Sequence, residues 1–547
     1  MFAVPKNPRS WLLILLVALV VLLTACGSTG SGSTSSSDSN SSTTLADKQV
    51  LRYPNVGTAD IGKLDPASGP DANSNEAISM IFSGLVRADS NLHAVPDQAS
   101  SWDISKDNKV YTFHLKSGIK FSDGTPVTAQ TYVYSWTRVL LPAVKSPIAP
   151  VLEEAIMGAN DVLSGKTTTL SGVKALDDHT FQVTLVRPTA YFLQLLTVSL
   201  FYPVNQSFVE KYGQTDWVNH VVGNGAGTGP FMVKSWQRNV SMTLVPNPNY
   251  YGARTKLKEV DMTFVRDVST GFRAYQAGQY DFVDNISAID QLQAQSMPGF
   301  TRKPILESDL LFFDNKTAPF NNTAVRQAFA AAIDKQALVK AVYHNSVTPA
   351  STIIPPDSYG AQDYAGIPYD PAKAKELLKT AYPDSSKIPT ITFSYPSTQV
   401  PSTLPEVLQQ MWKNTLGINV KLNGMELTSY NAATTKRNIQ FGFTQWGVYF
   451  PDPYEWLDLS LLSTSPNNNG SWSNAAFDQT VAQAEQTSGE QRIALYNKAE
   501  QIAIDNVGWL PLDHQSQAAV VSNKVHGLKL GSGGFYFGDW SDIYLTK

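Results

Sequence analysis

The chain has 547 residues, with 42 Lys and Arg against 46 Asp and Glu, which gives a formal charge of −4 at pH 7. This length allows two to four domains with substantial buried cores. Because the chain is nearly neutral and has no basic run after Arg9, it lacks the electrostatic surface that a nucleic acid requires, and we expect no nucleic-acid partner. The single cysteine excludes an intramolecular disulfide.

The first 25 residues are typical of an export signal. The apolar run from Trp11 to Leu23 follows two cationic residues and is short for a transmembrane helix, which needs roughly 17–25 residues. It ends at Leu23-Thr24-Ala25-Cys26, which resembles the lipobox of bacterial lipoproteins. That resemblance implies a signal peptide at 1–25 and a diacylglycerol anchor on Cys26, two acyl chains being enough for stable attachment. An uncleaved N-terminal membrane anchor is the alternative.

Residues 26–48 form a predicted linker after the anchored cysteine. From Gly27 to Thr44 the chain contains only Gly, Ser, Thr, one Asp and one Asn, so it cannot bury a core. A flexible coil of this length has an r.m.s. span of roughly 25 Å. We therefore expect the linker to hold a folded body close to a membrane face.

Strands and helices alternate irregularly in the first half of the body. Residues 49–56 predict a strand, and a second strand is predicted within 102–140, where apolar and polar residues alternate at Tyr111, Phe113 and Leu115. Thr128 is a predicted cap for the helix that follows. A further strand pair is expected at 172–188, with its turn at Asp177-Asp178.

Clear helical patterns occur in the second half. We predict helices over Val325–Tyr343, over Pro371–Ala381 with Asp370 as cap, and from Ser473 to Gln486. The mixture lacks a strict β-α-β rhythm and an internal repeat of 20–50 residues. These patterns predict an α/β protein of several domains.

Catalytic motifs are weak or absent. Residues 57–64, GTADIGKL, have the spacing of a phosphate-binding loop, but Leu64 replaces the hydroxyl that would bind Mg²⁺, so a simple loop is expected. The acidic pairs Asp177-Asp178 and Glu153-Glu154 are expected to be turn residues. No G-x-S-x-G or H-E-x-x-H motif occurs, and the seven histidines are scattered. We therefore expect a protein that is not an enzyme and uses no cofactor or metal.

Several sequence blocks together resemble one family. They are W-x-I-S-x-D-x-x-x-Y-T-F-H-L at 102–115, G-T-G-P-F at 227–231, N-P-N-Y-Y at 247–251 and Y-D-P-A-K-A-K-E-L-L at 369–378. From about residue 50 to the C-terminus, their kind and order resemble the family 5 extracellular solute-binding proteins. Members of that family are the oligopeptide- and dipeptide-binding components of ABC importers.

The resemblance implies an α/β fold of the periplasmic-binding-protein type (type II, cluster C), with hinged lobes and an extra inserted domain. Lobe I would comprise residues 49–90, 205–310 and 512–547, domain II residues 91–204, and lobe III residues 311–511. Two crossing segments would join lobe III to lobe I, with the solute between them. Closure about the hinge requires that the closed form bind solute more tightly than the open form.

The same resemblance implies a function. The protein would capture oligopeptides by main-chain hydrogen bonds and deliver them to the permease subunits of an ABC transporter. It would act as a monomer outside the cytoplasm, in a periplasmic space or on the outer face of the cell membrane, anchored through Cys26. The same scaffold with another solute (an oligosaccharide, a metal chelate or an opine) is one alternative, and a surface peptide hydrolase is a second.

Two positions depart from the family's pattern. The segment 445–457 resembles a Trp-x-x-Asp motif whose aspartate pairs with the α-amine of a peptide, but Tyr449, a neutral phenol, stands three residues after Trp446. Ser83 stands where peptide binders often have a glutamate. Asp452 would either take over the pairing or be a turn residue before a proline, and Trp446 would either line the cleft or belong to the core. We expect a blocked or longer peptide, or another polar molecule, rather than a free-amine dipeptide.

Overall fold

The computed structural model describes residues 44–147, 149–531, 534–536 and 539–547. The predicted signal peptide, Cys26 and most of the predicted linker therefore lie outside the described residues. Within the described part, no helix has the length and apolar character that crossing a membrane would need. The first described residues are tied to the last ones: Leu45 forms a β-bridge with Thr546, and the Ala46 N–H donates to the Leu545 carbonyl at 2.9 Å.

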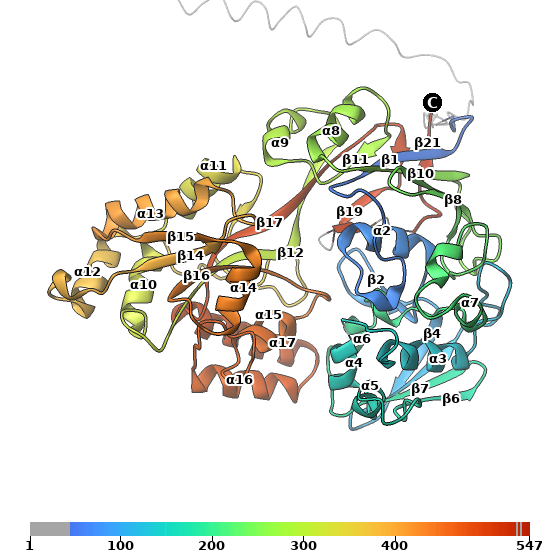
Figure 1. Cartoon of the computed structure of the whole chain (residues 1–547), viewed down its shortest axis with the longest axis horizontal. Helices are drawn as coiled ribbons and strands as arrows, with labels where there is room; N and C mark the ends of the chain where they lie inside the picture. Colours follow the sequence, from blue (N-terminus) through green and yellow to red (C-terminus); the bar gives the residue numbers. More distant parts are fainter. Residues whose placement is uncertain (1–43, 148, 532–533, 537–538) are drawn as a thin grey trace, which may run out of the picture. The chain divides into compact units, whose positions relative to one another are not determined.

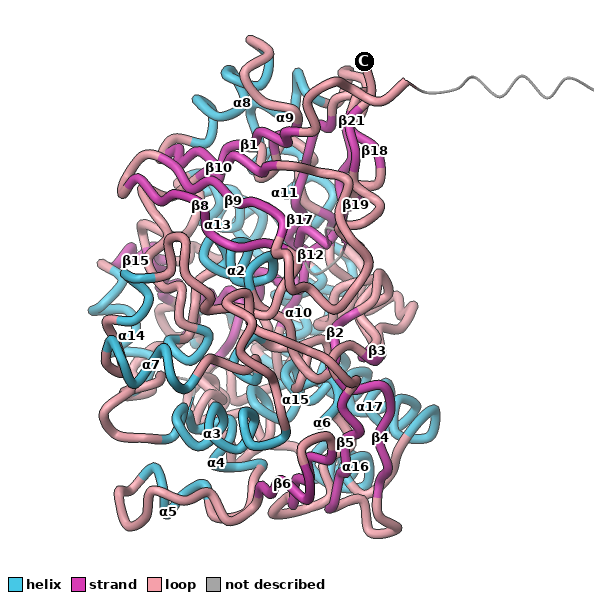
Figure 2. The backbone as a smooth tube through the Cα atoms, turned by 90° about the vertical axis from the view of Figure 1, so that its right-hand side faces the viewer, coloured by secondary structure: helices cyan, strands magenta, loops and turns pink. Residues whose placement is uncertain are grey.

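A four-stranded sheet in the order β1-β10-β9-β8 forms the centre of what we call lobe I (Figure 2). Strand β1 is parallel to β10, and the other pairs are antiparallel. Buried residues of the sheet share one core with those of helices α2 and α7. The elements of lobe I are β1 (Val50–Val56), α2 (Ala72–Ile81), α7 (Gln206–Tyr212), β8 (Phe231–Gln237), β9 (Ser241–Pro246), β10 (Glu259–Val265), β18 (Val525–His526), β19 (Lys529–Gly531), β20 (Gly534–Tyr536) and β21 (Tyr544–Leu545).

A second, antiparallel sheet in the order β4-β5-β7-β6 forms domain II. Trp136 of α3 packs edge-on against Phe181 of β7, with their ring centroids 5.0 Å apart, at the centre of this domain's core. Strand β2 lies before the predicted start of domain II at residue 91, but Val86 packs in the core of this domain. The elements of domain II are β2 (Val86–Ala88), β3 (Ala94–Pro96), β4 (Ala99–Ile104), β5 (Val110–Leu115), α3 (Ala129–Leu140), α4 (Ala149–Ala155), α5 (Ala159–Leu163), β6 (Val173–Asp177), β7 (Thr180–Thr184) and α6 (Phe192–Leu195).

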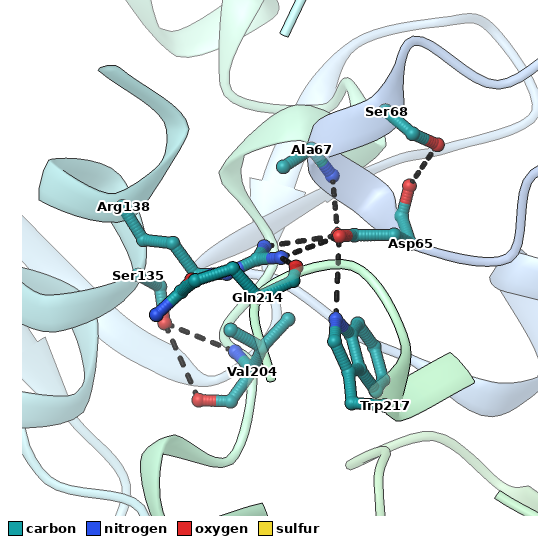
Figure 3. Close-up of polar contacts among 8 residues, drawn as sticks. All are labelled: Asp65, Ala67, Ser68, Ser135, Arg138, Val204, Gln214 and Trp217. Carbon is teal, nitrogen blue, oxygen red and sulfur yellow. Dashed lines mark hydrogen bonds and ion pairs between the residues drawn. The ribbon is translucent and has the colours of Figure 1, made fainter. Parts of the chain in front are cut away.

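A buried ion pair joins lobe I to domain II (Figure 3). The Arg138 guanidinium of α3 donates to both carboxylate oxygens of Asp65, at 3.0 and 2.5 Å, and Arg138 is only 1 % exposed. Asp65 also accepts hydrogen bonds from the Ala67 N–H and from the indole N–H of Trp217. Because two buried charges in bidentate contact cannot separate without losing several hydrogen bonds, lobe I and domain II are held together firmly.

The largest sheet forms lobe III, with the strand order β11-β17-β12-β16-β14-β15 and β13 paired to β17 (Figure 1). Alternate residues of β12 enter different cores: Leu311 and Phe313 pack under α10–α13, whereas Leu310 and Phe312 pack with α14–α17. The strands are β11 (Phe282–Val283), β12 (Phe300–Phe313), β13 (Thr348–Pro349), β14 (Thr392–Pro396), β15 (Lys421–Met425), β16 (Phe441–Gly447) and β17 (Leu510–Val521). The helices are α10 (Thr323–Ala331), α11 (Lys335–Tyr343), α12 (Pro371–Ala381), α13 (Thr403–Leu416), α14 (Leu427–Thr435), α15 (Pro453–Leu461), α16 (Ala475–Glu485) and α17 (Gly489–Asp505).

The long antiparallel strands β12 and β17 leave the core of lobe III and reach β11. There they pack with α8 (Val268–Gln276) and α9 (Ala288–Ala294), and Phe282 of β11 stacks on Tyr53 of β1 with centroids 4.6 Å apart. The ladder between β12 and β17 is interrupted between Pro304 and Ser308. The predicted lobe boundaries at 310/311 and 511/512 fall inside these two strands, and the division into lobes stays a prediction.

Most of the predicted elements are confirmed. Strands form at β1, β5, β6 and β7, helix α12 begins after its Asp370 cap, and α3 begins with a capping box at Thr128. The single helix predicted over Val325–Tyr343 is wrong, because the chain forms two helices there, α10 and α11. The Asp334 carboxylate accepts the Ala337 N–H and starts the second helix.

Candidate ligand-binding site

The segment 446–455, which carries three of the predicted site residues, connects β16 to helix α15 in lobe III. We call it the 446–455 loop. Its end is fixed by local chemistry: Asp452 accepts the Tyr454 N–H as helix N-cap, and Pro453 occupies the first helical position. Its start is fixed by the ladder, in which Trp446 pairs with Ser308 of β12. The loop is therefore anchored at both ends.

Asp452 lies beneath the loop and is only 1 % exposed. Arg492 of α17 donates to its two carboxylate oxygens, at 2.8 and 2.6 Å. With the N-cap bond, the Asp452 carboxylate accepts three hydrogen bonds from its own lobe. This geometry favours the turn role of Asp452 over the pairing role that the sequence left open.

Tyr449 lies at the surface of the loop, and 68 % of the residue is exposed. Its N–H donates to the Glu455 carboxyl at 3.2 Å. The loop therefore presents a neutral aromatic ring at the position where the family's motif has a carboxylate.

Glu455 supports the loop from the first turn of α15. It is 3 % exposed, and burial raises its pKa to about 8. Its backbone carbonyl accepts the indole N–H of Trp446 at 2.9 Å. A second carboxyl, Glu307, faces Gly447 from β12, and burial together with the charge of Asp309 raises its pKa to about 7. Because its pKa is about 8, the Glu455 carboxyl is mostly neutral at pH 7.

Trp446 is half-buried and contributes to the lobe III core. Its ring lies 5.4 Å from that of Trp509, at an angle of 56°. This packing satisfies the core interpretation, and a role in lining a cleft stays a prediction for the part of the ring that is exposed.

Ser83 lies after helix α2, away from lobe III, and belongs to a buried polar network with Gln98 and Thr228. Its N–H donates to the Thr228 hydroxyl at 3.2 Å, and its carbonyl accepts the Gln98 side-chain amide at 2.9 Å. Close by, Gly227 packs so tightly on helix α2 that an added Cβ would lie 2.0 Å from the Ile81 carbonyl oxygen, so the G-T-G-P-F block fixes this junction. Ser83 is 8 % exposed.

The structure thus brings three of the predicted residues, Trp446, Tyr449 and Asp452, together in one loop. Among the contacts of the described residues, none links Ser83 to that loop. The sequence analysis missed Glu455 and Glu307, whose burial depends on tertiary packing that no local pattern reveals. The same holds for Tyr191 of domain II, which stacks on Tyr454 and Phe450 at the end of the loop.

Within the described part of the chain, no three His, Cys, Asp or Glu side chains come together in a way that could hold a metal ion. The strands β12 and β17 connect lobe III to the rest of the described chain, and lobe III carries the anchored, surface-exposed 446–455 loop. A lobed α/β architecture of this kind is the class of fold that the sequence analysis predicts.

Comparisons with known proteins agree with this class. The chain belongs to family 5 of the bacterial extracellular solute-binding proteins, because the model described as "Bacterial extracellular solute-binding proteins, family 5 Middle" matches residues 93–468. The α/β periplasmic-binding-protein fold predicted from the resemblance is confirmed.

Two relatives and one solved structure illustrate the similarity. The chain is 32% identical to YgiS of Escherichia coli K12, named as a probable deoxycholate-binding periplasmic protein, over 90% of this chain and 92% of the relative. It is also 32% identical to the periplasmic oligopeptide-binding protein OppA of Salmonella typhimurium, over 88% and 90% of the two chains. The unliganded open form of the murein tripeptide binding protein MppA superposes with a TM-score of 0.82 at 28% identity, over 92% of this chain and 98% of MppA.

Proposed function

We propose that the protein is an extracytoplasmic receptor that captures oligopeptides between lobe I and lobe III and delivers them to an ABC permease. In this proposal a lipid on Cys26 holds the receptor at the membrane, and the protein carries out no chemistry on its solute. The family supports solute binding, and the names of OppA and MppA support peptides as the solute class.

The observation that carries the proposal is the exposed Tyr449 on a loop that is held in place by its neighbours. Glu455 accepts the Tyr449 N–H, and its carbonyl accepts the Trp446 indole, while Arg492 holds Asp452. A loop ordered before the solute arrives loses little conformational entropy on binding, which favours affinity.

The chemistry of this loop also favours one kind of peptide end. Tyr449 is neutral, Asp452 is already paired, and burial keeps Glu455 mostly protonated at pH 7. None of these three groups offers a free ionised carboxylate to an α-ammonium group, and the Glu307 carboxyl beside Gly447, with a pKa of about 7, is only partly ionised at pH 7. We therefore propose that the solute is a blocked or longer peptide, recognised mainly through its main chain.

Calorimetry with matched pairs of free and N-acetylated peptides tests both the binding of peptides and the proposed indifference to a free α-amine. The expected result is binding of both members of a pair, with no preference for the free amine. A strong preference for the free amine would refute the assignment of the loop. Absence of binding across a broad peptide library, together with an unchanged Tm, would refute the peptide receptor itself.

A gain-of-function variant sharpens this test. Tyr449→Asp restores a carboxylate at the exposed position and should raise the preference for free-amine peptides about 10–100-fold, because a charge-assisted hydrogen bond contributes about 1.5–3 kcal/mol. Tyr449→Asn is the matched neutral control and should show no such preference. Equal behaviour of the two variants would place the peptide end away from this loop.

The same binding experiment should include deoxycholate as a second candidate solute, because the relative YgiS is named for deoxycholate binding. The neutral loop with its exposed Tyr449 ring suits an amphipathic carboxylic acid as well as a peptide. Binding of deoxycholate without binding of peptides would change the solute and keep the receptor. Mass spectrometry of the peptides after incubation covers the hydrolase alternative, since any cleavage products would contradict a pure receptor.

The membrane anchor has its own test. In the native host, Cys26→Ala should leave the protein without diacylglycerol and move it out of the membrane fraction, whereas Cys26→Ala in the signal-free body should not change solute affinity. Detection of an unmodified Cys26 in the wild-type protein would refute the anchor.

A further inference from the structure

One aromatic side chain of domain II, that of Tyr191, stacks on the 446–455 loop. Tyr191, at the start of α6, stacks on Tyr454 with ring centroids 4.1 Å apart and an angle of 23°, and on Phe450 at 5.4 Å and 20°. Phe450 directly follows the exposed Tyr449, and Tyr454 directly precedes Glu455. Tyr191 therefore touches the loop on both sides of its buried Asp452.

The three rings are buried, so the contact between domain II and the loop excludes solvent. Tyr191, Phe450 and Tyr454 are 9, 2 and 7 % exposed, and the two lobe III rings belong to the same core cluster as the centre of domain II. At the edge, Arg187 lies 3.8 Å from Glu485, and the Arg492 guanidinium lies 5.9 Å from the Tyr191 ring. A small pocket beside this contact is lined by Arg187, Tyr191, Glu485 and Arg492, so the edge of the interface is open to solvent.

We propose that Tyr191 is a positioning residue for solute binding, through which domain II holds the 446–455 loop in its binding conformation. The inference rests on the proposed function. Tyr191 itself need not touch the solute: its ring restrains Phe450 and Tyr454, and these carry the neighbouring Tyr449 and Glu455, which are joined by a hydrogen bond. The inserted domain is then part of the binding machinery.

The geometry also says which property of Tyr191 matters. Offset stacking requires a flat ring, so phenylalanine preserves the contact and leucine does not, although both fill apolar space. The hydroxyl faces that of Tyr454, and the pKa of Tyr191 is raised well above its usual value, chiefly by burial. The ring rather than the hydroxyl should therefore dominate.

The experiment uses the full chain and one peptide that the wild type binds. Tyr191→Ala and Tyr191→Leu should each weaken binding about tenfold, and Tyr191→Phe should restore it to within about twofold. Tyr212→Ala is the matched control, because Tyr212 stacks on His220 at 4.0 Å entirely within lobe I. That control removes a stacked but more exposed tyrosine ring away from the loop and should leave affinity unchanged.

A second readout separates positioning from general stability. Hydrogen exchange at the Tyr449 amide should accelerate in Tyr191→Ala and Tyr191→Leu but not in Tyr212→Ala, because only the former release the loop. Exchange in α13, on the other face of the lobe III sheet, should not change in any variant. A double-mutant cycle with Tyr454→Ala should show that the losses in affinity are not additive.

The outcomes distinguish this inference from the proposed function. If the wild type binds no peptide, the proposed function fails. If the wild type binds and both Tyr191→Ala and Tyr191→Leu bind equally well or more tightly, the positioning role is overturned and the receptor stands. Should Tyr191→Ala fail to fold, Tyr191→Leu keeps the contact apolar and decides the question alone.

Discussion

Two Asp-Pro sequences in this protein make the same set of contacts at two different places. Asp65-Pro66 and Asp452-Pro453 both begin a helical segment, and each aspartate caps it by accepting a backbone N–H. Each carboxylate is also held by both terminal nitrogens of a buried arginine, Arg138 in one case and Arg492 in the other. The chemistry is therefore nearly identical in the two regions.

What differs is what each ion pair joins. Arg138 and Asp65 connect domain II to lobe I, with Trp217 and Gln214 completing the network. Arg492 and Asp452 are both within lobe III, where they fix the 446–455 loop. Domain II reaches lobe III through the Tyr191 stack, through an edge-on ring contact between His93 and Tyr359 at 5.8 Å, and through the more exposed Arg187–Glu485 pair. A buried bidentate pair locks two bodies, whereas an aromatic contact tolerates small shifts, so we expect relative motion between lobe III and the rest.

The largest effect is expected from removing the pair between lobe I and domain II. Arg138→Ala leaves the buried Asp65 carboxylate without its cation and should lower the free energy of unfolding by about 3–5 kcal/mol. Urea denaturation measures this change. A loss under about 1 kcal/mol would contradict the view that this pair locks the two bodies.

A conservative change at both arginines sharpens the comparison. Arg492→Lys and Arg138→Lys each keep a charge but lose the bidentate geometry, and each should cost about 1.5–3 kcal/mol of stability. Only Arg492→Lys should also weaken peptide binding, because only Asp452 supports the loop that carries Tyr449. Equal effects of the two variants on the calorimetric Kd would remove the functional distinction between the two regions.

The buried carboxyl beneath the loop predicts a dependence of stability on pH. The native pKa of Glu455 is raised to about 8, well above that of an unfolded chain, so the native state holds a proton that the unfolded state has lost. Stability from this group is full below about pH 4.5 and is lost as the pH rises towards 8. The slope contributed in that window is at most about 1.4 kcal/mol per pH unit.

Urea denaturation between pH 5 and 9 measures this slope. Glu455→Gln keeps an acceptor for the Tyr449 N–H and should flatten the profile, while the exposed Glu490→Gln is the control and should leave it unchanged. Parallel profiles for Glu455→Gln and the wild type would mean that another buried carboxyl governs the dependence.

Much of the secondary structure could be predicted from the sequence because short-range patterns specify it. The Asp370 and Thr128 caps and the alternating strand at Tyr111 are short-range patterns, and the structure contains each of them. The break at Asp334 was missed, since a cap inside a continuous apolar stripe is hard to distinguish from a helix interior. The roles of Trp446 and Tyr449 in binding a solute stay predictions.

What could not be predicted depends on contacts between distant segments. In sequence Asp452 has the pattern of a turn residue. No local pattern indicates that Arg492, 40 residues later, donates hydrogen bonds to its carboxylate. The burial of Glu455 and the contact of Tyr191 with Tyr454 likewise arise only after the sheets and helices have packed. Such contacts decide which groups near the loop are charged, and therefore which solutes it favours.

The smallest effect is expected from Arg187→Ala, and it tests which part of the contact between domain II and lobe III matters. Arg187 and Glu485 approach only to 3.8 Å, with 47% and 32% of their side chains exposed. An exposed pair of this kind contributes about 0–1 kcal/mol, so stability and peptide affinity should barely change. Because Tyr191→Leu keeps Arg187 but loses the stack, the two variants together separate charge from ring packing. A larger loss of affinity in Arg187→Ala than in Tyr191→Leu would mean that the ion pair, and not the aromatic contact, connects domain II to the loop.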